Sequence, residues 1–109
     1  MNAYVIDRIY DAQGHTGNTY YFRIIEVETG LVYNAVTERL EVNPDRIDSS
    51  IAMPEDENSF GSFPVTIPAK LITGKRYDYV IYKQSGSTPA NTDDVQKQKT
   101  FIHGSNFGF

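Results

Sequence analysis

The stretch LITGKRYDYVIY, residues 71–82, decides the fold of this chain. Leu71, Gly74 and Tyr77 stand three residues apart, and alternating apolar residues follow the tyrosine. This spacing is typical of a tyrosine corner, in which the leucine plugs the end of a core and the glycine permits a tight arch. The tyrosine hydroxyl then satisfies a backbone group a few residues upstream. The simpler alternative is a generic strand that follows a glycine turn.

A tyrosine corner lies near the start of the sixth strand of an immunoglobulin-like sandwich, so it predicts a particular architecture. Side chains alternate across a strand, and the pattern after the corner therefore predicts that Tyr77 and Tyr79 point into the core. By the same alternation, Val80 and Tyr82 are expected to point outwards.

Periodicity of two dominates the rest of the chain as well, which favours strands over helices. About seven strands separated by turn signals predict an all-β, immunoglobulin-like or fibronectin-III-like sandwich. Pro64 and Pro68 cannot donate to a ladder, so their strand is expected at an edge. Alternating lysines on the last strand would blunt a second exposed edge. The expected strands cover residues 3–10, 19–27, 31–36, 46–53, 62–67, 75–84 and 94–102.

Length and composition limit the possible functions. The 109 residues match a single domain, which we expect over residues 1–103 with a short tail at 104–109. The net charge is −4 and the ten lysines and arginines are scattered, so no nucleic-acid partner is expected. The absence of cysteine excludes disulfides and thiolate metal sites. Asp7 and Arg8 interrupt the first apolar run, so we expect neither a signal peptide nor a membrane span.

Two longer stretches carry a family resemblance. They are GNTYYFRIIEVETGLVYN (17–34) and SFPVTIPAKLITGKRYDYVIYKQSGSTPANTDDVQ (62–96). Together they resemble a small β-sandwich module of tailed-bacteriophage structural proteins, and the resemblance extends roughly from Tyr4 to Ile102. In that module an F-R-I strand, a hairpin and a Y-N strand precede a P-V-T-I-P strand and an L-x-x-G-x-x-Y corner. The usual aspartate–glycine hairpin appears here as Thr29–Gly30.

The resemblance implies a function in virion assembly and no catalysis. Such modules occur in tail, neck, fibre and head-decoration proteins, so we expect a non-enzymatic structural protein of the virion. Its partners would be other capsid or tail subunits, contacted by multiple copies in a symmetric assembly. The alternative is a carbohydrate-binding module that recognises host-surface glycan through tyrosines.

Other candidate sites look structural from the sequence. His15 and His103 have no recognisable ligand spacing, and we expect them to be solvated loop residues. The acidic segment 55–57 has the composition of a solvated turn tip, and Asx-turn chemistry accounts for Asn91 and Asp93. No acid pair, nucleophile–base pair or phosphate-binding glycine pattern stands out, so no catalytic residue, metal or cofactor is predicted.

Aromatic residues are the remaining candidates for a partner interface. Tyr21, Tyr33 and Tyr82 are expected on outer or half-outer faces, where a ring can stack on a sugar or anchor a protein contact. They could equally fill the sheet surface beside long polar side chains. Phe107 and Phe109 lie in a tail of small polar residues, and we expect them to dock on a neighbouring subunit.

Overall fold

A computed structural model describes residues 3–14 and 18–104 of the chain. Nearly all of the regular structure is β-strand, with one helical turn, α1 (Arg46–Ser49). The strands are β1 (Tyr4–Tyr10), β2 (Thr19–Glu26), β3 (Val32–Asn34), β4 (Arg39–Glu41), β5 (Ile51–Ala52), β6 (Ser62–Ile67), β7 (Arg76–Gln84) and β8 (Asp94–Ile102).

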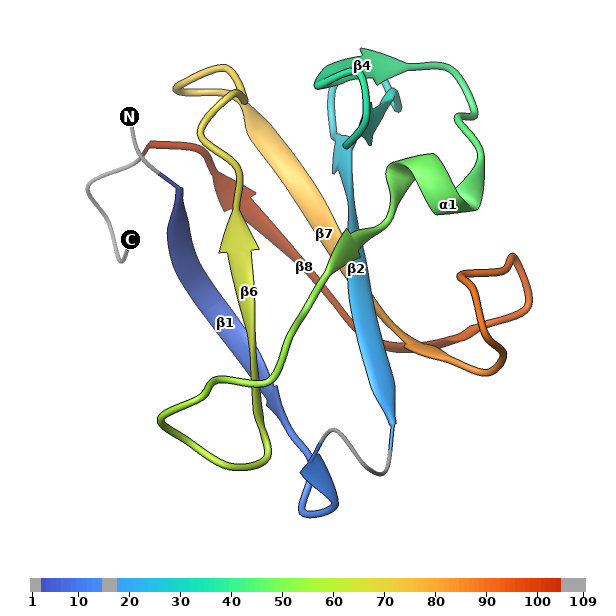
Figure 1. Ribbon diagram of the computed structural model, residues 1–109. Coiled ribbons are helices and arrows are strands. Elements are labelled where there is room, and N and C mark those ends of the chain that lie inside the picture. The colour runs from blue at the N-terminus through green and yellow to red at the C-terminus, as the bar shows by residue number, and fades with distance from the viewer. Residues whose placement is uncertain (1–2, 15–17, 105–109) are drawn as a thin grey trace.

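The strands form two antiparallel sheets that face each other (Figure 1). β1 and β6 make a two-stranded sheet, and the six-stranded sheet has the order β4-β3-β2-β7-β8 with β5 beside β2. The chain between β5 and β6 crosses from the large sheet to the small one (Figure 1). The all-β prediction is confirmed, and the arrangement is compatible with a β-sandwich.

The core lies between the two sheets and is built from alternate residues. β2 contributes Tyr20, Phe22 and Ile24, and the small sheet contributes Phe63 and Val65, all of them buried. The predicted inward direction of Tyr77 and Tyr79 is confirmed, since both belong to the same cluster. This is the packing that a period of two produces when one face of each sheet is covered.

The contacts expected of the tyrosine corner are present. The hydroxyl of Tyr77 accepts a hydrogen bond from the backbone N–H of Ile72 at 3.0 Å. Gly74 has a φ of 86°, a conformation that strongly favours glycine. Leu71 is buried at the end of the core. The alternative of a generic strand after a glycine turn does not account for the hydroxyl contact.

The prediction of a strand over residues 46–53 is mostly wrong. Residues 46–49 form α1, and only β5 (Ile51–Ala52) is extended. The hydroxyl of Ser49 donates to the carbonyls of Asp45 and Arg46, and Ser50 also donates to Arg46, so local side-chain bonds support the helical turn. Arg23 Nε donates to the same Ser49 hydroxyl at 2.9 Å and fixes α1 against β2.

The predicted edge strands are confirmed. β6 pairs only with β1, and β8 pairs only with β7 among the described residues. The predicted return strand over 31–36 is shorter, because a turn between β3 and β4 begins at residue 35. There the Asn34 side chain accepts hydrogen bonds from the N–H groups of Val36 and Thr37, and Glu38 has a φ of 59°.

Candidate functional site

The outer face of the large sheet carries a second, smaller apolar cluster of Tyr21, Val80 and Tyr82. Val80 and Tyr82 do point away from the main core, but they are not exposed. Tyr21 and Tyr82 are only 2% and 7% exposed, and their rings stack with centroids 5.0 Å apart. The expectation that these tyrosines lie on an accessible surface is therefore wrong. The cause is tertiary, because α1 and the loop 85–93 cover them.

Arg46 of α1 holds this cover in place. Its guanidinium carbon lies 4.5 Å from the centre of the Tyr82 ring, a cation–π distance. One guanidinium nitrogen donates to the hydroxyl of Tyr21 at 3.1 Å and to the carbonyl of Ala90 at 3.2 Å. Arg46 Nε is buried and has no hydrogen-bond partner within the described part of the chain. A single side chain thus joins α1, the large sheet and the loop 85–93.

Asp93 ties the same loop to the sheet. Its carboxylate accepts hydrogen bonds from the Tyr21 hydroxyl at 2.6 Å, the Ala90 N–H at 2.8 Å and both the N–H and the hydroxyl of Ser85. Burial opposes the charged form, but these bonds outweigh it and hold the pKa of Asp93 far below its usual range. The Asx-turn predicted at Asp93 is wrong, because its bonds run back to Ser85 and Ala90 instead of forward along the chain.

Two adjoining hollows flank the contact between α1 and this loop. The first, of about 360 Å³, is lined by residues 45–48 and 89–91. The second, of about 300 Å³, lies over β2 and shares Ile47 and Pro89 with the first. Ile47 is exposed between them. Asp45, Arg46 and Asp48 all line the first hollow, so its lining carries side chains of both charges.

Tyr33 lines a third hollow, of about 190 Å³, together with residues 38–40 and 70–72. Its ring is 4% exposed and belongs to the main core, so for Tyr33 the expectation of an outer or half-outer face is itself wrong. Burial and the nearby Glu38 carboxylate raise the pKa of Tyr33. Glu38 also forms an ion pair with Lys70 at 3.5 Å, and both charged side chains line the hollow.

The other predicted candidates fall into three groups. His15, Phe107 and Phe109 lie outside the described residues. His103 is fully buried, so its expected solvation is wrong, and its Nδ1 shares a 3.0 Å hydrogen bond with the Tyr4 hydroxyl. Burial lowers the pKa of His103. The acidic segment supports its own turn, since Glu55 accepts from the Gly61 N–H at 2.6 Å.

No metal centre emerges from the described residues, because no three His, Cys, Asp or Glu side chains within 3–14 and 18–104 are grouped to hold an ion. No helix in that part of the chain is long and apolar enough to span a bilayer.

A cluster that the sequence reading missed joins the two sheets. Asp7 of β1 accepts hydrogen bonds from the Tyr79 hydroxyl and, at 3.1 Å to each carboxylate oxygen, from Lys97 of β8. Burial alone would raise the pKa of Asp7, but these bonds and one from the N–H of Arg8 lower it overall. An aspartate within an apolar run was the visible signal. Its partners lie 72 and 90 residues away, which no local pattern reveals.

We compared the chain with known protein families, curated proteins and solved structures. No protein family, curated protein or solved structure was found to match this chain.

Proposed function

We propose that this chain is an immunoglobulin-like structural module of a tailed-bacteriophage particle and that it acts through protein–protein contacts. The support comes from the motifs of residues 17–34 and 62–96, which resemble such modules, and from the corner contact between Tyr77 and Ile72. Head decoration and a tail or neck adaptor are both compatible with these motifs. Many copies on a symmetric particle would allow each contact to be weak, because many weak contacts made together bind tightly.

One structural observation favours assembly by contact. β1 and β8 are neighbouring edge strands on one side of the molecule, and each pairs with a single strand within the described residues. Unpaired strand edges are templates for another chain, and proteins that keep a long one exposed either protect it or use it. At nine residues, β8 is one of the two longest strands in the described structure.

Antibody–gold electron microscopy on purified particles of the source phage tests the proposal. Label spread over heads identifies a decoration or minor capsid protein, and label confined to tails or necks identifies an adaptor or fibre part. Mass spectrometry of disrupted virions detects a copy that the intact particle hides. If neither method finds the chain, the proposal fails.

The expected docking tail is tested on the same particles. Replacement of Phe107 and Phe109 by alanine should leave the free energy of unfolding unchanged and reduce incorporation into particles. An equal loss of stability and incorporation would assign both side chains to the chain's own packing.

A carbohydrate-binding module remains the second candidate function. Its sugar site would lie on a different surface from the tyrosine faces expected from the sequence. Tyr21, Tyr33 and Tyr82 are too buried to serve as stacking platforms. The hollow between α1 and residues 89–91 instead combines two carboxylates with the apolar surfaces of Ile47 and Pro89, a mixture that suits a sugar ring. A glycan screen with Asp45→Asn and Asp48→Asn as loss variants, and Glu57→Gln as the control, distinguishes this function from assembly.

A further inference from the structure

The two lateral sides of the molecule differ. On one side, the chain that leaves β5 crosses from the large sheet to β6 in the small one (Figure 1). On the other side, β1 and β8 are both edge strands, and within residues 3–14 and 18–104 no further strand pairs with either. The contact of Asp7 with Lys97 spans this side. We call it the open side, defined by the outer edges of β1 and β8.

The open side leaves part of the core partly covered. Tyr4, Ile6 and Ile9 pack against the main core but are only partly buried. An added strand would therefore cover apolar surface in addition to pairing backbone groups.

The free backbone groups of β8 can be assigned from the ladder. The N–H of His103 donates to Lys75 at 3.1 Å, so odd-numbered residues near this end of β8 bond to β7. In agreement, the N–H of Val27 donates to the carbonyl of Arg76 at 3.1 Å, so even-numbered residues of β7 bond to β2 and odd-numbered ones to β8. The N–H and C=O groups of Gln98 and Thr100 consequently point away from β7, to the free edge.

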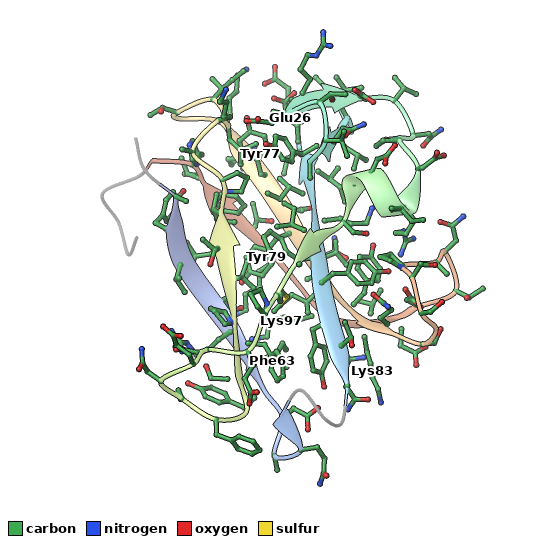
Figure 2. All side chains as sticks on the ribbon, viewed as in Figure 1. Glu26, Phe63, Tyr77, Tyr79, Lys83 and Lys97 are labelled. Carbon is green, nitrogen blue, oxygen red and sulfur yellow. The ribbon has the colours of Figure 1, made fainter. Side chains whose placement is uncertain are left out.

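The side chains of this edge carry a positive charge on the face that looks towards β1. Lys99 and Lys97 stand opposite Tyr79 and Ile81, which face the core, so both lysines lie on the core-facing side of β8. Lys97 lies near Tyr79 in the space between the sheets and bonds to Asp7 (Figure 2). Lys99 is exposed, and no carboxylate of the described residues lies within ion-pair distance of it.

Lys97 and Lys99 argue against a second copy of this chain as the strand that pairs with the outer edge of β8. When two copies of one strand pair antiparallel about a two-fold axis, directly opposite side chains share a face. If the two-fold axis passes through Gln98, Lys97 of each copy stands opposite Lys99 of the other. If the axis moves by one residue in either direction, Lys97 or Lys99 stands opposite the same lysine of the other copy. Like charges directly opposite each other destabilise a strand pair. The same positions favour a partner strand with carboxylates.

We propose that the outer edge of β8 accepts an extended segment of a partner protein with acidic residues at alternate positions. Its backbone pairs with Gln98 and Thr100, and one of its carboxylates faces the exposed Lys99. The inference rests on the proposed function in one respect, that the partner is another structural protein of the particle. The lysines thus discriminate against self-pairing while they select the acidic strand.

The first experiment uses a nine-residue peptide of alternating threonine and glutamate, titrated into the full chain and followed by amide chemical shifts in NMR. We expect shifts concentrated on β8 and β1, with those of Gln98 and Thr100 among the largest. A peptide of alternating threonine and lysine is the control and should leave these amides unchanged. Equal shifts with both peptides, shifts elsewhere, or no shifts at millimolar peptide would overturn the proposal.

Two matched pairs of variants separate backbone pairing from charge. Gln98→Pro removes an N–H that points to the free edge, which an edge strand tolerates, whereas Gln98→Ala keeps it. Gln98→Pro should abolish binding and Gln98→Ala should retain it. Lys99→Glu should weaken binding about tenfold or more, whereas Arg39→Glu, the same charge change on β4, should not. Circular dichroism and thermal unfolding confirm that each variant is folded.

The same variants distinguish this inference from the proposed function. If wild-type chain is found in particles and Gln98→Pro is incorporated equally well, the strand-addition site is wrong and the structural role stands. If the acidic peptide binds as expected and the chain is absent from particles, the site stands and the phage assignment is wrong.

Discussion

Tyr79 of β7 donates a hydrogen bond to the carboxylate of Asp7 on β1, so a phenol of one sheet is bonded to an acid of the other. Lys97 of β8 approaches the same carboxylate to 3.1 Å. Figure 2 shows Tyr79 and Lys97 in the space between the sheets. This cluster supplies polar, directional contacts where the apolar core gives way to the open side. A half-buried carboxylate with such partners is costly to disrupt.

Asp7 should make the protein sensitive to acid. Its pKa is lowered in the folded state, so its contribution to stability is present above the unfolded value of about 4 and is lost as the pH falls further. Asp7→Asn should therefore reduce the free energy of unfolding at pH 7 and flatten its decline below about pH 4. Urea unfolding between pH 7 and pH 2.5 measures both effects. Glu57→Gln, at an exposed acid, should reproduce the wild-type curve.

Tyr77→Phe should destabilise the protein by about 1–2 kcal/mol. The substitution keeps the buried ring and removes only the hydroxyl that accepts from the Ile72 N–H. A shift of the urea midpoint at constant slope measures the loss. Tyr10→Phe removes a hydroxyl from a ring that is 74% exposed and should change little. Equal effects of the two substitutions would mean that the corner contact contributes nothing.

Gly61→Ala should cost more stability than Gly74→Ala. Both glycines have positive φ, at 79° and 86°, so alanine at either position is strained by about 1 kcal/mol. A Cβ at Gly61 would also lie 2.5 Å from the backbone oxygen of Asp11, whereas at Gly74 nothing lies within 4 Å. Thermal unfolding of the two variants compares them directly. A larger loss at Gly74 would contradict the packing between residue 11 and Gly61.

Tyr21 should resist ionisation at high pH. Burial and the hydrogen bond to Asp93 raise the pKa of Tyr21 to about 12. Because the folded value is raised, this contribution to stability is present below the unfolded pKa of about 10 and is lost between there and about pH 12. Burial also raises the pKa of Tyr79, so a titration of tyrosinate absorbance should show late-ionising phenols in the wild type and one fewer of them in Tyr21→Phe. An unchanged titration in that variant would refute the assignment.

Local patterns predicted most of the strands and one decisive contact. Alternation in residues 19–27 and 75–84 was sufficient to assign β2, β7 and their inner faces, because a half-buried strand must separate apolar from polar side chains. The corner could be predicted because its leucine, glycine and tyrosine interact within six residues. The helical turn α1 was missed, because serine hydroxyls and Arg23 decide it and a two-residue period does not.

What the sequence determined by itself was therefore the all-β class, the inward faces of β2 and β7, and the edge positions of β6 and β8. Only the tertiary structure decided which outward residues are covered. Tyr82 and Val80 alternate outwards as predicted, yet Arg46 and a loop anchored by Asp93 bury them. The open side likewise depends on how the two sheets are stacked, which brings Asp7 to Lys97 across 90 residues. The two-residue period predicts on which face of a strand a side chain lies, whereas only the packing of other segments determines whether that face is covered.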